Sequence, residues 1–168
     1  MLHKIISKQR NSNLCFVCGL ENDFGIHAHF YVTENQELIA LFTPSEKHQS
    51  YPERMHGGIA SAILDETIGR AILNKYETEV WGVTVEFNLK FKKPIPLNQQ
   101  LKVIGRITTE NSRMFEGTGE IILPNGDIAV TAHGKYLKVP IEKITDFDVD
   151  DVEWKIVELE NDPNEIEI

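Results

Sequence analysis

The chain has 168 residues, of which 41% are hydrophobic and 26% charged, and its formal net charge is −9 at pH 7. This length and composition are typical of one soluble globular domain. No stretch is apolar for long enough to span a membrane, which argues against a transmembrane protein. Residues 1–13 lack the apolar centre of a signal peptide, so we expect a cytoplasmic protein.

The negative charge is concentrated at the C-terminal end. Residues 141–168 hold 11 acidic and 2 basic residues, whereas residues 1–140 hold 15 of each and are neutral. We therefore expect a domain over 1–140 and an acidic extension over 141–168. The acidic charge argues against a nucleic-acid partner for the extension only. For the whole chain we expect neither nucleic acid nor a membrane as a partner. In the extension, Val152, Trp154 and Ile156 alternate with other residues, which favours a short added strand or a docked segment.

Six segments show the pattern of β-strands, being rich in β-branched and aromatic residues or alternating between apolar and polar. They are residues 27–33, 37–42, 80–91, 99–109, 114–123 and 128–139. The polar residues 33–36 fit a hairpin turn between the first two. Asn125-Gly126 predicts a second hairpin between the last two, because Asn-Gly favours the tight turn that antiparallel strands need.

One segment between the second and third strands predicts a helix. Residues 59–73 are apolar around nearly the whole helical circumference, which is typical of a buried helix. The helix is too short for a membrane, so protein must surround it. A curved antiparallel sheet wrapped around it satisfies this need. We expect an α+β hot-dog fold, with a long central helix and a sheet of five to six strands.

Two features of this helix point to chemistry. His56-Gly57-Gly58 stands at its start, where glycines allow close approach of a ligand and free N–H groups favour an anion or an oxyanion. Asp65 follows Gly58 by seven residues, about two turns or ~10 Å along the same face. A buried carboxylate needs a hydrogen bond or a counter-charge. A capping or ion-pairing role is the alternative for Asp65, and packing is the alternative for the glycines. Glu66 is the rival acid, but it points about 100° away from Asp65, so we expect only one of the two to face the site, and the motif spacing favours Asp65.

These residues resemble a known family. Residues 56–65 read H-G-G-x6-D, which resembles the signature of hot-dog acyl-CoA thioesterases of the phenylacetic-acid-degradation (PaaI-like) type. Residues 82–91 with Lys93-Pro94 resemble the family's strand after the helix. An N-terminal segment of one branch of the family is similar to Cys15-Phe16-Val17-Cys18-Gly19 with Asn22, Gly25, Ile26 and His27. The resemblance covers residues 13–139.

The resemblance implies thioester hydrolysis at a site between two subunits, hence a homodimer or a dimer of dimers. Gly57 and Gly58 of one chain would offer N–H groups to the thioester carbonyl. Asp65 of the other chain would be the nucleophile or the base that activates water. The substrate would be an acyl-CoA, with coenzyme A as part of the substrate and no separate cofactor.

The resemblance also implies supporting roles around this pair. His56 would position the thioester or the loop, and Thr84 matches a position where a hydroxyl lies near the attacking water. The family has an Asn or Gln shortly before H-G-G, for which Gln49 is the best match. Ser50 stands at the position where some members have Asn, so this sequence departs from them there.

A basic segment offers a place for the phosphates of coenzyme A. Residues 87–109 contain five basic residues and no acidic one, and an anionic substrate needs such a patch. The substrate-binding candidates are Asn88, Lys90, Lys92, Lys93 and Arg106. The alternative for the lysines is solubility and protection of a sheet edge.

Other readings remain open. Cys15, Cys18, His27 and His29 supply four potential zinc ligands, but their spacing is not a common one and we expect no metal. A dithiol redox motif usually opens a helix in a βαβ unit, which is missing here. A dehydratase on the same fold would use other His and acid arrangements. A non-catalytic acyl-CoA-binding protein would use the same glycines and Asp65 without turnover.

Overall fold

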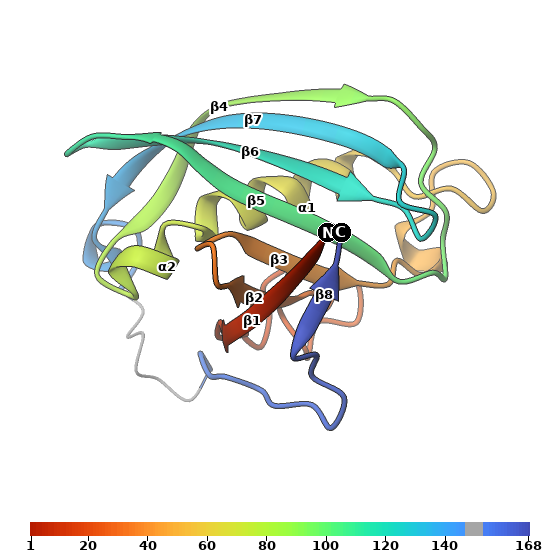
Figure 1. The fold of residues 1–168 in the computed structure, drawn as a ribbon, viewed down its shortest axis with the longest axis horizontal. Helices are drawn as coiled ribbons and strands as arrows, with labels where there is room; N and C mark the ends of the chain where they lie inside the picture. Colours follow the sequence, from red (N-terminus) through yellow and green to blue (C-terminus); the bar gives the residue numbers. More distant parts are fainter. Residues whose placement is uncertain (147–152) are drawn as a thin grey trace.

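The computed structural model describes residues 1–146 and 153–168. An antiparallel eight-stranded sheet curves around one long helix (Figure 1), in the strand order β4-β7-β6-β5-β3-β2-β1-β8. The strands are β1 (Leu2–Lys8), β2 (His29–Thr33), β3 (Leu38–Phe42), β4 (Trp81–Phe91), β5 (Leu101–Glu110), β6 (Met114–Ile122), β7 (Ile128–Val139) and β8 (Glu165–Glu167).

The central helix α1 spans Gly57–Arg70 and is followed by the short α2, Leu73–Tyr76. Single 3-10 turns lie at Glu46–His48 and Ile141–Lys143. The sheet approaches α1 closely at two glycines of β6, where no side chain separates the strand from the helix. A Cβ on Gly117 would lie 2.5 Å from Cγ2 of Ile68, and one on Gly119 would lie 3.0 Å from the same side chain. Within the described residues, no helix combines the length and apolarity of a membrane span.

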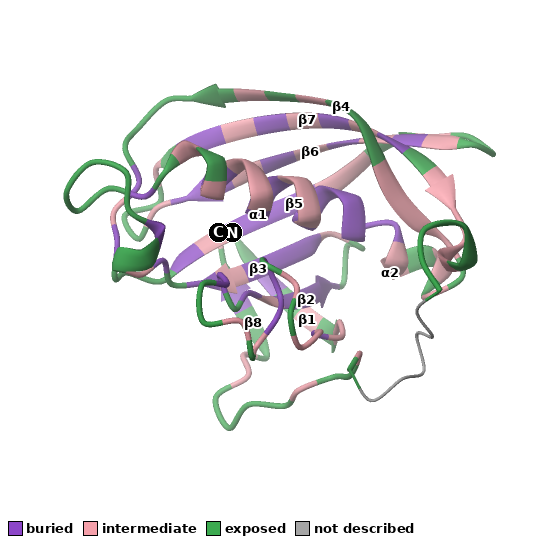
Figure 2. Ribbon diagram, turned by 180° about the vertical axis from the view of Figure 1, so that it is seen from behind, coloured by how far each residue is buried: buried purple, intermediate pink, exposed green. Residues whose placement is uncertain are grey.

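The core lies between α1 and the inner face of the sheet (Figure 2). Ile63, Leu64 and Ile68 are completely buried there, which accounts for the apolar circumference of the helix. The expected helix is confirmed, and it begins two residues before the predicted start and ends three residues before the predicted end. All six expected strands are present with small shifts of their ends.

The predicted strand number of five to six is wrong, because the sheet has eight strands. The two additional strands come from the ends of the chain and pair with each other through Leu2–Lys4 and Glu165–Glu167. β1 buries only His3 and β8 buries only Ile166, so neither strand has a strong local pattern. Both termini therefore lie side by side at one edge (Figure 1).

The acidic extension packs on the domain at several points. Trp154 packs against Trp81, with ring centroids 5.4 Å apart, and Lys155 pairs with Asn11 in an isolated bridge. Asp162 accepts hydrogen bonds from Lys8 and from the hydroxyl of Tyr31, each at 2.6 Å. Of the predicted alternating residues, Val152 lies outside the described residues. The domain boundary at residue 140 stays a prediction.

Candidate active site

The start of α1 is organised by His56, the residue that caps the helix. Its Nδ1 accepts a hydrogen bond from the N–H of Gly58 at 2.8 Å. The N–H of Gly57 donates to no group among the described residues. The two glycines therefore differ: the Gly57 N–H is available to a ligand, whereas the Gly58 N–H is held by the imidazole.

Asp65 lies two turns further along α1, half-buried, and its carboxylate is fixed by two hydroxyl groups. Oδ1 accepts hydrogen bonds from Thr84 Oγ1 at 2.9 Å and from the Tyr136 hydroxyl at 3.1 Å. Oδ2 accepts none from the described part of the chain. Burial, the larger cause, and the negative charge of Asp65, the smaller one, raise the pKa of Tyr136 above its usual range. This phenol therefore remains a hydrogen-bond donor at neutral pH.

Sequence reasoning did not identify Tyr136. The residue is fully buried on β7, and its ring stacks on Phe115 with centroids 4.9 Å apart. Gly134 leaves the space that the phenol needs, since a Cβ there would lie 2.5 Å from the Tyr136 hydroxyl oxygen. The alternation of β7 predicts that Tyr136 faces inward, but the contact with Asp65 links residues 71 positions apart.

A cavity of about 330 Å³ opens beside Asp65. Thr84 and Tyr136 line it together with aromatic and aliphatic side chains, namely Trp81, Trp154 and Leu73. Its wall also includes Gly69, Gly82, Cys15, Cys18, Glu66 and Arg70. Neither His56 nor the two glycines line this cavity. The helix start and the carboxylate of one chain therefore do not face the same cavity.

Cys15, Cys18 and Glu66 form a compact group in that wall. Their ligand atoms all lie within 4.8 Å of one another, and both thiols are free. A hydrogen bond from the Cys15 thiol lowers the pKa of Cys18 to about 5, against the effect of burial. Burial, followed by the charge of Cys18, raises the pKa of Glu66 to about 7. A hydrogen bond to Cys18 and burial raise the pKa of the Cys15 thiol, so Cys15 is the protonated member of this group.

Gln49 lies on the side of the fold where α1 begins. Its Oε1 accepts a hydrogen bond from the Glu53 N–H at 3.2 Å, and it lines a separate cavity of about 380 Å³. The loop is tied to the helix start because the His56 N–H donates to the His48 carbonyl at 2.8 Å. Gln49 is therefore placed with the Gly-Gly end and away from Asp65 of its own chain.

The basic candidates divide into two groups. Lys90 and Lys92 are exposed, with no ion pair among the described residues, and Lys93 pairs with Asp127 at 2.6 Å. Asn88 donates to Glu86 at 3.1 Å on the same strand.

Arg106 differs from these residues because β7 and β6 separate its strand, β5, from β4. It donates to Glu37 at 2.5 Å and to Glu120 at 2.9 Å. Its charge is balanced by these carboxylates, and the structure does not bring it together with the lysines at β4.

Comparison with known proteins extends these observations. The thioesterase superfamily matches residues 53–130, from the loop before α1 to the first residues of β7. The chain is 33% identical over 99 residues to the acyl-coenzyme A thioesterase THEM4 of Rattus norvegicus. That match covers 54% of this chain and 41% of the rat protein, so the chain spans about two fifths of that relative's length.

Solved structures show the same fold. A thioesterase superfamily protein is 22% identical, with a TM-score of 0.66 over 72% of this chain and 58% of the other. The PaaI protein of the phenylacetic acid degradation operon of E. coli is 12% identical, with a TM-score of 0.62 over 68% of this chain and 80% of its own. These findings confirm the resemblance carried by the H-G-G-x6-D segment. Residues 53–130 thus resemble the thioesterase superfamily, and the architecture is the hot-dog fold that these solved structures share.

Proposed function

We propose that the chain hydrolyses acyl-CoA thioesters at a site shared by two copies. The observation that carries this proposal is the carboxylate of Asp65, presented by a buried helix to a cavity. Two hydroxyl groups hold Oδ1, which leaves Oδ2 for the reaction. A carboxylate in this position acts on a thioester as a general base or as a nucleophile.

The chemistry follows from these atoms. As a base, Oδ2 of Asp65 accepts a proton from water while the water oxygen attacks the thioester carbon. As a nucleophile, Oδ2 attacks that carbon itself, and water then cleaves the acyl-enzyme anhydride. In both routes the C–S bond breaks, the coenzyme A sulfur takes up a proton, and the free acid is released. An N–H donor stabilises the oxyanion that forms on the carbonyl oxygen.

The N–H donor in this proposal comes from the partner chain, because Gly57 does not line the cavity of Asp65 in its own chain. Gly57 supplies the free N–H, and His56 keeps the helix start in place through Gly58. The sheet supports pairing of two copies. β4 is a long edge strand, with Val85 51% and Phe91 57% exposed, and such an edge is a template for another strand. A dimer of such dimers is compatible with this arrangement.

The lysines at the end of β4 complete the proposed substrate site. Lys90, Lys92 and Lys93, with Asn88, form a basic edge that suits the phosphates of coenzyme A. We leave Arg106 out because two carboxylates occupy it. We place the protein in the cytoplasm, which fits two free thiols in contact range of each other.

The test is release of free coenzyme A from a panel of acyl-CoA esters. We expect turnover by the unmodified chain and a loss of at least roughly 100-fold in kcat for Asp65→Asn and Asp65→Ala, since a positioned base typically contributes that much or more. Asp23→Asn, which changes an exposed loop aspartate, serves as the matched control and should retain full activity.

Two results would overturn the proposal in different ways. Activity retained in both Asp65 variants would remove Asp65 from the reaction. Tight binding of acyl-CoA by the unmodified chain without release of the thiol would favour a non-catalytic binding protein, the alternative that uses the same site.

A further inference from the structure

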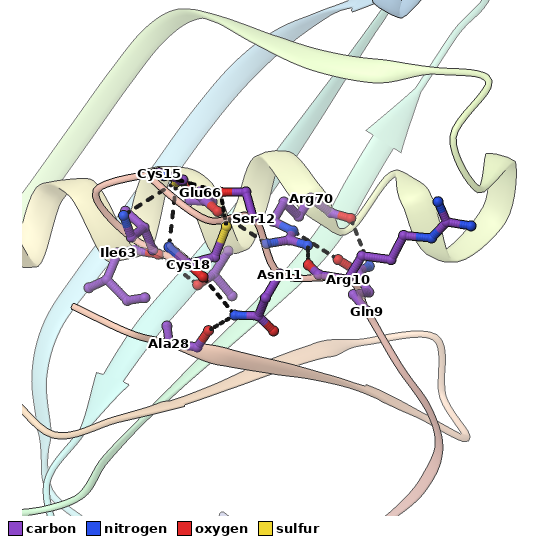
Figure 3. Close-up of polar contacts among 12 residues, drawn as sticks. Gln9, Arg10, Asn11, Ser12, Cys15, Cys18, Ala28, Ile63, Glu66 and Arg70 are labelled. Carbon is purple, nitrogen blue, oxygen red and sulfur yellow. Dashed lines mark hydrogen bonds and ion pairs between the residues drawn. The ribbon is translucent and has the colours of Figure 1, made fainter. Parts of the chain in front are cut away.

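The cysteines of the C-x-x-C segment meet an acidic side chain from α1 (Figure 3). The thiol of Cys15 donates to Oε2 of Glu66 at 3.3 Å. Cys18 lies in the same group, with all three ligand atoms within 4.8 Å of one another. Among the residues that the structure describes, no other set of three His, Cys, Asp or Glu side chains meets this criterion. Two thiols and a carboxylate at this range are a donor set for a metal ion.

The backbone of the loop directs two N–H donors at the sulfur of Cys15. Sγ of Cys15 accepts hydrogen bonds from the N–H of Val17 at 3.3 Å and the N–H of Cys18 at 3.4 Å. The turn is tight, since a Cβ on Gly19 would lie 2.3 Å from the Cys15 carbonyl oxygen. Metal binding displaces the proton of the Cys15 thiol, and the two N–H donors then stabilise the thiolate that binds the ion.

Buried groups fix this loop to the rest of the fold. The amide of Asn11, which is 1% exposed, donates to the Cys18 carbonyl at 2.8 Å and to the Ala28 carbonyl at 2.9 Å. The backbone of Cys18 is therefore held in position before any ion binds. Such pre-organisation lowers the cost of assembling a site.

The distances suit a tetrahedral ion. Zinc binds sulfur at about 2.3 Å and carboxylate oxygen at about 2.0–2.2 Å, so sulfur and oxygen ligands of one ion lie roughly 3.5 Å apart. The observed separation of Cys15 Sγ and Glu66 Oε2 is 3.3 Å. An ion can therefore enter between them with a shift of a few tenths of an ångström.

The charges also balance. Arg70, which is buried, donates to Oε1 of Glu66 at 3.1 Å and to Oε1 of Gln9 at 3.0 Å. It orients the carboxylate and leaves Oε2 for a ligand. With a divalent ion bound, two thiolates and one carboxylate face the two charges of the ion and the single charge of Arg70. The buried cluster is then neutral, as a low-dielectric site requires.

We propose that Cys15, Cys18 and Glu66 bind one zinc ion, with its fourth position open to the cavity that Asp65 lines. Two thiolates disfavour magnesium and calcium, and a carboxylate with them disfavours Cu(I), which leaves zinc as the matching ion. The ion fixes the N-terminal loop to α1. This site does not depend on the proposed thioesterase activity.

The proposed site differs from the four potential zinc ligands of the sequence, because it contains neither His27 nor His29. Nε2 of His27 contacts the Asn22 carbonyl at 2.6 Å, and the residue is exposed. His29 and His27 line another cavity, of about 600 Å³, which contains neither cysteine. Glu66 takes the place of these histidines because α1 brings it to the loop from 51 residues away.

The test uses the reduced full-length chain, stripped of metal and titrated with Co²⁺ as a spectroscopic substitute for zinc. We expect one ion per chain, with sulfur-to-cobalt charge-transfer absorption and the visible bands of tetrahedral cobalt, and displacement by Zn²⁺. Cys15→Ser and Glu66→Gln should each weaken binding on the order of 100-fold, because each removes one of three protein ligands. His27→Ala serves as the control and should bind with unchanged affinity.

Glu66→Gln keeps both thiols and keeps the proposal falsifiable if a cysteine variant fails to fold. Failure of the unmodified reduced chain to develop the charge-transfer band overturns the site. An unchanged affinity in Glu66→Gln overturns the assignment of Glu66, and a loss in His27→Ala would restore the alternative ligand set. None of these readouts requires thioester hydrolysis, so their failure is separate from failure of the proposed function.

Discussion

The hydroxyl of Tyr136 donates a 3.1 Å hydrogen bond to the same carboxylate oxygen of Asp65 that accepts the hydroxyl of Thr84. Two donors on Oδ1 fix the plane of the carboxylate and concentrate its free acceptor capacity on Oδ2. Tyr136 donates from the buried side of the sheet, and in the proposed reaction it is a positioning residue. The carboxylate of Asp65, the proposed base or nucleophile, is thus oriented by the buried Tyr136 as well as by its own helix.

Tyr136→Phe should lower kcat for acyl-CoA hydrolysis roughly tenfold with little change in KM, because a hydrogen bond to a charged group contributes about 1.5–3 kcal/mol and Thr84 retains part of the effect. Steady-state kinetics would measure this split. Tyr76→Phe, which removes a hydroxyl bonded to Glu110, is the matched control. An unchanged kcat in Tyr136→Phe would show that the phenol does not position Asp65.

Gly57→Pro should abolish most of the activity while preserving the fold. Proline is favoured at the first position of a helix, and the extended backbone of His56, with ψ of 137°, tolerates a following proline. The change therefore removes one N–H and little else. Loss of an oxyanion donor typically costs 100- to 1000-fold in kcat, roughly.

Mixing this variant with Asp65→Ala tests the shared site directly. Each variant alone carries two defective sites, whereas a hybrid dimer joins the intact Gly57 of one chain to the intact Asp65 of the other. Activity should therefore reappear in co-expressed chains. If hybrid dimers form but show no activity, Gly57 and Asp65 of one active site come from the same chain.

Charge reversal at Lys92 and Lys93 should raise KM for acyl-CoA several-fold and leave kcat within about twofold, because these lysines meet the phosphates and not the thioester. Lys4→Glu, on β1 near the opposite edge of the sheet, is the control. The effect should shrink as ionic strength rises. An equal KM in both variants would exclude this edge as the coenzyme A site.

Acid should release part of the C-terminal extension. Burial opposes the shift, but hydrogen bonds from the Leu159 N–H, Lys8 and Tyr31 lower the pKa of Asp162 to about 2. A lowered pKa stabilises the fold above the unfolded value near 3.8, and that stabilisation is lost as the pH falls through 2. Asp162→Asn should cost about 1 kcal/mol of unfolding free energy at pH 7, a figure reduced for partial exposure.

Urea unfolding at a series of pH values would measure this dependence. The difference between Asp162→Asn and the unmodified chain should be constant from pH 7 to about 5 and vanish near pH 2. A difference that persists at pH 2 would mean that packing, and not the charge of Asp162, holds this part of the extension.

Much of this fold can be predicted from local sequence patterns. The six central strands alternate or are rich in β-branched and aromatic residues, and five of them, β3 to β7, contact α1. Gly126, with φ of 85°, adopts the turn that Asn-Gly predicts. The two terminal strands, β1 and β8, cannot be predicted in this way. β8 has three residues, and its single buried side chain is Ile166. Its pairing with Leu2–Lys4 depends on the rest of the sheet being formed.

The site shows the same division. Asp65 could be predicted because a carboxylate in a buried helix needs a hydrogen bond or a counter-charge. Thr84 could be predicted because it matches the family pattern. Tyr136 and Glu66 could not be assigned because their partners lie 71 and 51 residues away. Residues of these types are common in strands and helices, so only their meeting in space distinguishes them.

The contribution of Trp154 to the cavity of Asp65 has a consequence for the proposed selection of acyl groups. This wall is built by a segment outside the superfamily match, which ends at residue 130. A change in this terminal segment would alter the cavity wall without disturbing α1, the helix that carries Asp65. For the proposed thioesterase, the end of the chain would then set the range of acyl groups accepted, while the proposed reaction at Asp65 stays the same.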